Sequence, residues 1–229
     1  MKPLATTDIG TAARAVFGDR LPIAERYAEL LTETGVDRGL IGPREADRLW
    51  ERHLLNSAVL GELIPHSYRV LDVGSGAGLP GIPLALARPD LHVVLLESMA
   101  RRVAWLQEVI DELGLAVSVH RGRAEDPQVR DELGQDPVVT ARAVAPLSRL
   151  ARWCLPLVAP GGRLLAVKGA SAEEEVARDV DAVRAMGGAA VEIVQCGGTI
   201  VRPPTTVVVV SRLAERVVPP VRRRRRKDR

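Results

Sequence analysis

From residue 68 onward, short apolar runs alternate with longer amphipathic segments along the chain. The clearest amphipathic segment is 101–114, where Val103, Leu106 and Ile110 fall on one helical face before Gly114. This alternation predicts a parallel sheet with helices on both faces, which is a doubly wound α/β fold. The expected strands are 69–73, 92–97, 116–121, 137–144, 162–169, 189–195 and 205–212.

The last two expected strands are separated only by "CGGTIVRPP", residues 196–204, which leaves no room for a helix. Strands joined by so short a connection pair antiparallel. The pattern therefore predicts a seven-stranded sheet with six parallel strands and one inserted antiparallel strand. Ligands of such sheets bind beyond the carboxyl ends of the strands.

The first 65 residues have apolar positions at helical spacing and predict a helical extension. One helix is expected in 20–36 and a second in 43–64, and the second buries Leu49, Leu54, Leu55, Ala58 and Val59. Three arginines spaced four apart form a stripe on another side of this second helix: Arg44, Arg48 and Arg52. The stripe is either a solvated face, with Glu45 and Glu51 as ion-pair partners, or a surface that faces phosphate.

Composition narrows the class of protein. The chain is 46% hydrophobic and 27% charged, as expected for a globular protein. It shows no signal-peptide core and no apolar stretch near the ~18 residues of a membrane span, so a cytoplasmic protein without a membrane partner is expected. The two cysteines and four histidines have no ligand spacing, and no metal site is expected.

The basic charge is concentrated at the C-terminus. The last nine residues, "VRRRRRKDR", carry seven basic groups and one acid, so residues 1–220 are mildly acidic although the whole chain has a net charge of +3. The expected divisions are a helical extension in 1–65, a sheet domain in 66–213 and a basic, disordered tail in 214–229. Such a tail is either merely solvated or an arm that touches nucleic acid.

A glycine-rich loop, "DVGSGAGLPGIP", follows the first expected strand. Gly74, Gly76 and Gly78 allow a ligand to approach the backbone closely. A dinucleotide site is the first alternative, but the glycines are out of phase with the strand end, and Asp72 would repel a pyrophosphate. The acid suits a cationic cofactor, which favours S-adenosylmethionine.

Other strand ends supply further candidates. Glu97 closes the second strand, where an acid accepts hydrogen bonds from ribose hydroxyls, and Ala124 and Glu125 are placed to face the adenine. Arg142 and Lys168 end the fourth and fifth strands and are expected to point into the ligand crevice, as candidates for positioning an acceptor base. Their alternative role is that of paired ends of buried strands.

If S-adenosylmethionine donates a methyl group, the residues constrain the acceptor of that group only weakly. The segment after the fourth strand, "TARAVAPL", lacks the "[DN]-P-P-[YF]" pattern that handles exocyclic amines, and Cys154 is poorly placed as a nucleophile. A ring nitrogen needs neither a base nor a covalent step, because its lone pair is already available. No covalent or acid–base catalyst is therefore expected.

Six segments in order and at the expected spacing resemble the RsmG (GidB) family of bacterial ribosomal RNA methyltransferases. They are "RHLLNSAVL", "DVGSGAGLPGIPLA", "LLESMARRVAWLQEV", "RAE", "TARAVAPL" and "GGRLLAVKG", within about residues 20–212. The resemblance implies a class I S-adenosylmethionine-dependent methyltransferase with a Rossmann-like seven-stranded sheet and an N-terminal helical extension. It also implies methyl transfer to N7 of a guanine in the decoding-region loop of 16S rRNA, with S-adenosylhomocysteine as the product.

The resemblance also assigns residues. Its cofactor contacts fall on Gly74, Leu79, Ala124, Glu125 and Arg142, beside Asp72, Gly76, Gly78 and Glu97 from the loop analysis. The expected RNA contacts are Arg44, Arg48, Arg52, His53, Arg101, Arg102 and Lys168. The expected partner is 16S rRNA or a small-subunit particle, bound by a monomer.

Two other functions stay open at this point. One is a module that senses S-adenosylmethionine or a nucleotide without catalysis. The other is a methyltransferase of small molecules, which the basic stripe argues against.

Overall fold

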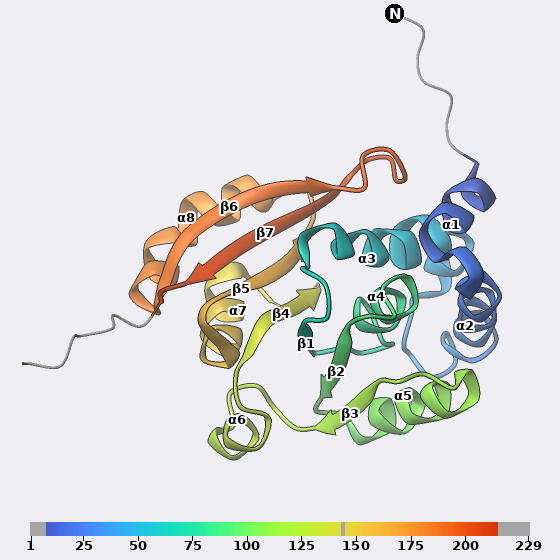
Figure 1. Ribbon diagram of the computed structural model, residues 1–229, viewed down its shortest axis with the longest axis horizontal. Helices are drawn as coiled ribbons and strands as arrows, with labels where there is room; N and C mark the ends of the chain where they lie inside the picture. The colour runs from blue at the N-terminus through green and yellow to red at the C-terminus, as the bar shows by residue number, and fades with distance from the viewer. Residues whose placement is uncertain (1–7, 143–144, 215–229) are drawn as a thin grey trace, which may run out of the picture.

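The computed structural model describes residues 8–142 and 145–214, apart from the side chains of Pro43, Arg44 and Ala46. At its centre lies one seven-stranded sheet in the order β3-β2-β1-β4-β5-β7-β6 (Figure 1). The strands are β1 (Arg69–Val73), β2 (His92–Glu97), β3 (Ser118–Arg121), β4 (Asp136–Arg142), β5 (Val158–Lys168), β6 (Gly188–Cys196) and β7 (Thr205–Arg212). Strand β7 pairs antiparallel with both β5 and β6, and β1 to β5 pair parallel, which confirms the predicted arrangement.

Helices cover both faces of this sheet. They are α1 (Ile9–Phe17), α2 (Leu21–Thr34), α3 (Asn56–Ala58), α4 (Gly81–Ala87), α5 (Ala100–Leu113), α6 (Pro127–Leu133), α7 (Leu147–Cys154) and α8 (Ala172–Ala185). Side chains alternate along each strand, so Val70 packs into the core under α2, α4 and α5, whereas Leu71 packs into the core under α6, α7 and α8. Two hydrophobic cores therefore hold one sheet.

The N-terminal helices belong to the first of these cores. Tyr27 and Leu31 of α2 are buried in the same cluster as Ile82 of α4 and Trp105 of α5. Short 3-10 turns, η1 (Gly18–Arg20) and η5 (Leu155–Leu157), lead into α2 and β5. The boundary expected near residue 65 stays a prediction, because the extension and the sheet share this core.

The segment predicted as one helix in 43–64 is helical but does not keep one winding. It consists of a 3-10 helix η2 (Pro43–Arg48), a π-helix η3 (Trp50–Leu55), α3, and a 3-10 helix η4 (Val59–Leu63). The wider π-helical turn lies where the guanidinium of Arg142 donates to the carbonyl oxygens of Arg52 and His53. A side chain that inserts into the backbone hydrogen-bond ladder disturbs helices in this way. Its predicted apolar face, from Leu49 to Val59, is buried as expected.

The described residues contain no helix that is both long and apolar enough to cross a membrane. In the same ranges, no three side chains of the metal-binding types gather at one place. The predicted basic tail lies outside the described residues, except for Ala214.

Candidate cofactor and acceptor site

The glycine loop between β1 and α4 has the backbone that its sequence predicts. Gly74, Gly76 and Gly78 all have positive φ, at 73°, 58° and 108°. Residues with a Cβ rarely adopt these angles. The amide of Gly74 donates to the carbonyl of Leu96 at 2.8 Å, so the loop is attached to the end of β2.

The carbonyl of Ala77, in the middle of this loop, accepts hydrogen bonds from two buried side chains. The Ala77 oxygen accepts hydrogen bonds from the Tyr27 hydroxyl and from the Trp105 indole, each at 3.0 Å. Both side chains are fully or almost fully buried. A Cβ at Gly78 would lie 3.0 Å from the Tyr27 hydroxyl and would also strike Ile82, so the third glycine is needed for packing. Side chains from α2 and α5 therefore hold the backbone of the loop at Ala77 and Gly78.

Asp72 lies beneath the loop and not on its open side. Its side chain has no solvent exposure, and its carboxylate accepts from the Thr140 hydroxyl at 2.9 Å and from the Gly81 amide at 3.2 Å. Burial raises the pKa of Asp72 to about 6, although these hydrogen bonds favour the charged form. A direct contact with a cofactor ammonium is predicted from the sequence, but this geometry favours an effect through the loop and through charge.

The packing at Asp72 also explains one glycine of the "LPGIP" stretch. A Cβ at Gly81 would lie 2.9 Å from a carboxylate oxygen of Asp72 and would strike Leu95. Only glycine allows α4 to begin this close to the sheet.

Glu97 ends β2 next to the loop, as the sequence predicts. It is 3% exposed, and its oxygens accept from the Gly76 amide at 3.0 Å and from the Met99 amide at 2.8 Å. The oxygen that accepts from Gly76 keeps a second lone pair that can accept from a ribose hydroxyl, whereas the other oxygen also accepts from the Ser98 hydroxyl at 3.4 Å. Arg102 approaches Glu97 at 3.8 Å, so this predicted RNA contact lies at the cofactor loop, whereas Arg101 is exposed on α5.

The segment after β3 adjoins the same edge, because β3 pairs with β2 through Glu97 and Arg121. Ala124 is buried there, and its carbonyl accepts from Arg130 at 2.8 Å. Glu125 is exposed and lies 3.6 Å from Arg123. Gly74, Glu97 and Ala124 thus come from the ends of three adjacent strands, as a binding site for a nucleoside requires.

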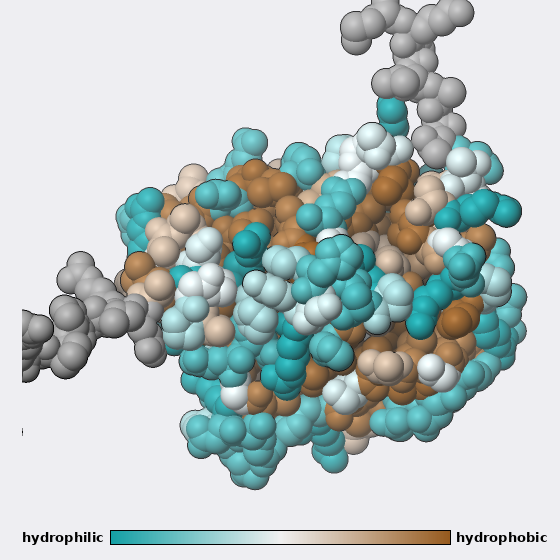
Figure 2. Space-filling model, in the orientation of Figure 1, coloured by the Kyte–Doolittle hydropathy of each residue, from teal (hydrophilic) through white to brown (hydrophobic). Residues whose placement is uncertain are grey.

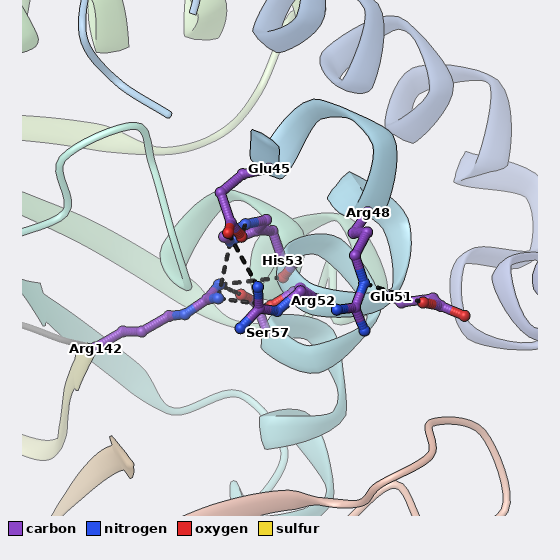
Figure 3. A network of polar contacts seen from close by, with 7 residues as sticks. All are labelled: Glu45, Arg48, Glu51, Arg52, His53, Ser57 and Arg142. Carbon is purple, nitrogen blue, oxygen red and sulfur yellow. Dashed lines mark hydrogen bonds and ion pairs between the residues drawn. The ribbon is translucent and has the colours of Figure 1, made fainter. Parts of the chain in front are cut away.

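Arg142 at the end of β4 reaches the N-terminal helices (Figure 3). Its guanidinium donates to the Arg52 carbonyl at 2.6 Å, the Ser57 hydroxyl at 3.0 Å and a ring nitrogen of His53 at 2.8 Å. Burial lowers the pKa of Arg142, and the negative charge of Asp72 opposes this change. Arg142 therefore lies between the cofactor loop and the arginine stripe.

The arginine stripe is paired with acids, as one of its two alternatives predicts. Arg52 lies 3.0 Å from Glu45, and Arg48 lies 3.9 Å from Glu51. Glu45 also contacts His53 at 2.7 Å. The side chain of Arg44 lies outside the described residues.

A cleft of about 1230 Å³ opens beyond the carboxyl ends of β4 and β5. Six basic side chains line it: Arg48, Arg52, Arg142, Lys168, Arg178 and Arg202. The glycine loop is not part of its wall, and Arg142 joins the two regions. Figure 2 shows apolar surface among polar groups over β6 and β7, beside α3. Three glutamates also line the cleft, Glu51, Glu174 and Glu175, so its basic side chains exceed its acidic ones six to three, an excess that suits a polyanionic ligand.

Lys168 lines this cleft, but its ammonium group is engaged. It donates to a carboxylate oxygen of Glu175 and to the carbonyl of Ala145, each at 2.7 Å, and its side chain is 8% exposed. This is the alternative role considered from the sequence, a paired end of a buried strand. A phosphate contact would require this pair to separate.

Several residues of the site have no signal in the sequence. Tyr27 and Trp105 reach the loop from α2 and α5, and Arg178 and Arg202 reach the cleft from α8 and the β6–β7 connection. An apolar helical pattern explains the burial of the aromatic residues but not their shared carbonyl. Finding the two arginines would have required the strand order.

Comparison with known proteins places this geometry among methyltransferases. Residues 20–202 match the family model described as rRNA small subunit methyltransferase G. A ribosomal RNA small subunit methyltransferase G of Mycobacterium sp. (strain JLS) is 57% identical over 189 residues, which cover 82% of this chain and 84% of that protein. The protein of the same name from Salinispora arenicola is 59% identical over 202 residues, covering 86% and 83%.

Solved structures agree on the fold. The apo S-adenosylmethionine-dependent methyltransferase SibL is 20% identical with a TM-score of 0.57, covering 90% of this chain and 74% of that chain. Fibrillarin from Aeropyrum pernix, crystallised with natively bound S-adenosylmethionine, is 18% identical with a TM-score of 0.50, covering 68% and 73%. The sheet is that of class I S-adenosylmethionine-dependent methyltransferases, as predicted.

Proposed function

Since the chain belongs to the rRNA small subunit methyltransferase G family, we propose that it methylates N7 of a guanine in the decoding-region loop of 16S rRNA. The protein is an S-adenosylmethionine-dependent methyltransferase of small-subunit rRNA, and the proposal concerns the position and the atom that accept the methyl group. The observation that carries it is the position of Arg142: it follows Ala141, which pairs with Val73 at the start of the cofactor loop, and it also lines the basic cleft.

The residues present fit S-adenosylmethionine. A Cβ built at Gly76 would meet no atom closer than 3.7 Å, so this side of the loop is open to a ligand. Glu97 would accept from the ribose hydroxyls, and Ala124 and Glu125 would face the adenine. The remaining proposed contacts are Gly74, Gly78, Leu79 and Arg142, and the buried Asp72 would act on the cofactor through its charge. When bound, S-adenosylmethionine supplies a methyl group on a positively charged sulfur.

The reaction asks little acid–base chemistry of the protein. N7 of guanine attacks with its own lone pair, the N7–methyl bond forms as the sulfur–methyl bond breaks, and no proton moves. The protein must hold the base in line and exclude water. Arg142 would face the base, where its Nε, the one guanidinium N–H without a partner among the described residues, would donate to guanine O6.

The basic cleft would bind the RNA backbone. Arg48 and Arg52 would exchange their carboxylate partners for phosphate, and exposed ion pairs are weak enough to exchange at little cost. Arg44 and Arg101 are the other proposed phosphate contacts. The partner would be 16S rRNA or a small-subunit particle in the cytoplasm, bound by a monomer. Residues 1–65 would be the RNA-facing extension, 66–213 the methyltransferase domain, and 214–229 the basic tail.

The test is transfer of radioactive methyl from S-adenosylmethionine by the purified protein to naked 16S rRNA, to small subunits and to 23S rRNA as a control. Labelled RNA is then reduced and cleaved with aniline, which breaks the chain at 7-methylguanine. One new cleavage in the decoding-region loop of 16S rRNA is expected. Labelling without aniline cleavage would contradict N7 as the acceptor.

A further inference from the structure

The guanidinium of Arg142 is held almost entirely by the N-terminal helices. A guanidinium has five N–H groups. Four of them are used: Nη1 donates to the Ser57 hydroxyl at 3.0 Å and the His53 carbonyl at 3.4 Å, and Nη2 donates to the Arg52 carbonyl at 2.6 Å and to His53 Nδ1 at 2.8 Å. Nε has no partner among the described residues. The group is thus fixed with one donor left over.

These contacts define the state of His53. A guanidinium can only donate, so Nδ1 of His53 must be the acceptor. The ring proton is then on Nε2, which donates to a carboxylate oxygen of Glu45 at 2.7 Å. The other oxygen of Glu45 accepts from Arg52 at 3.0 Å (Figure 3). His53 is therefore neutral, with both nitrogens engaged.

This arrangement does not suit a phosphate contact. A histidine that binds phosphate needs a free N–H or a positive charge. The charged groups that face His53 are Glu45 from η2, Arg52 from η3 and Arg142 from β4. Burial and the charge of Arg142 lower the pKa of His53 against the effect of Glu45. His53 is 15% exposed in its side chain, so little of it reaches solvent.

We propose that His53, itself oriented by Glu45, is a positioning residue that holds Arg142 toward the acceptor base. This role rests on the proposed function, in which Arg142 faces guanine. Through the chain Glu45–His53–Arg142, the N-terminal extension sets the geometry of a side chain on β4. The extension would then contribute to turnover as well as to RNA binding.

The sign of the pH dependence separates this role from a phosphate contact. When pH falls through the pKa of His53, which lies below its ordinary value of 6.5, Nδ1 gains a proton and can no longer accept. The imidazolium then repels Arg142, and kcat falls. A phosphate-binding His53 would behave in the opposite way, since protonation would strengthen RNA binding.

Two substitutions divide the functions of the ring. The amide oxygen of Asn lies near the position of Nδ1, so His53→Asn can keep the acceptor for Arg142. The amide nitrogen of Gln lies near Nε2, so His53→Gln can keep only the donor to Glu45. We expect His53→Gln to lower kcat by about tenfold or more, because one hydrogen bond to a charged group is lost. His53→Asn should recover most of this loss and remove the acidic fall in kcat.

The control is His66→Asn, since the His66 side chain is 89% exposed and pairs with Asp90, far from Arg142 in the chain. The KM for RNA and the affinity for S-adenosylmethionine should change little in both His53 variants. Equal losses of kcat in Asn and Gln, or an acidic limb that persists in His53→Asn, would overturn the positioning role. Tighter RNA binding at low pH in the wild type would also overturn it.

A second measurement needs no turnover. Ring nitrogen chemical shifts of the full chain should show His53 at pH 7 as the neutral tautomer with its proton on Nε2. A charged ring, or a proton on Nδ1, would contradict the role directly. A wild type that transfers no methyl to 16S rRNA would instead contradict the proposed function, so the two failures are distinguishable.

Discussion

The cofactor loop and the basic cleft are neighbouring regions built on different principles. In the loop, Gly74, Glu97 and Ala77 already have protein partners, and the parts come from two consecutive strand ends. The cleft draws Arg48, Arg142 and Arg202 from the N-terminal helices, the middle of the sheet and a late hairpin connection.

The difference concerns how each region meets its ligand. The loop presents a fixed backbone, so the cofactor does not have to organise it. The arginines of the stripe are paired with Glu45 and Glu51, so RNA must replace acids that are already in place. A rigid cradle therefore adjoins a surface of exchangeable charges, and Arg142 belongs to the rigid part.

The largest effect is expected from a substitution in the cofactor loop that weakens binding of S-adenosylmethionine. Gly74→Asp places a side chain at a φ of 73° and adds a negative charge above Asp72. We expect the affinity for S-adenosylmethionine to fall about 1,000-fold, measured by calorimetric titration. Gly114→Asp is the matched control, because it has a similar φ of 60° and open space around its Cβ. Equal affinities of Gly74→Asp and the wild type would refute the loop as the cofactor site.

Lys168 tests whether every basic residue of the cleft is exchangeable. Lys168→Met leaves the carboxylate of Glu175 without its partner, at a site where both side chains are mostly buried. The free energy of unfolding should fall by about 3 kcal/mol in chemical denaturation. Arg184→Gln, which breaks an exposed pair with Asp181, should have almost no effect. If Lys168→Met is stable but binds RNA poorly, Lys168 is a phosphate contact after all.

Substitution of Asp72 should change the free energy of unfolding and the cofactor affinity in opposite directions. Its folded pKa of about 6 lies above the ordinary 3.8, so the wild type loses stability from this group as pH rises from about 4 to 6. Asp72→Asn removes that loss and should be at least as stable as the wild type at pH 7. Its affinity for the cationic cofactor should nevertheless fall about tenfold. Thermal unfolding from pH 4 to 7, together with ligand titration, measures both, and a variant that is unstable at pH 7 contradicts the reasoning.

The smallest effect is expected from a substitution in the arginine stripe, measured as weaker RNA binding. Arg48→Gln removes one exposed charge, so RNA binding should weaken by roughly threefold, and the slope of log affinity against log salt should fall by about one. Cofactor affinity should stay unchanged. An unaltered salt slope would show that Arg48 remains paired with Glu51 in the complex.

The sequence predicts those features of the fold and the site that depend on residues close together in the chain. Strand ends and glycines with positive φ follow from short patterns, so the strand positions, their directions and the loop backbone could be predicted from the sequence. The π winding of 50–55, the Lys168–Glu175 pair and the Tyr27 contact could not. Each depends on segments that meet only in the folded sheet, and no local propensity encodes such a meeting.

The most direct test of the central claim is made on RNA from the native host. The gene is deleted, 16S rRNA is isolated, and 7-methylguanine is mapped by reduction and aniline cleavage, with the wild-type gene and Gly74→Asp as complementing copies. We predict that cleavage in the decoding-region loop disappears on deletion and returns only with the wild-type copy. A cleavage signal that persists unchanged in the deletion strain would contradict the assignment of the substrate.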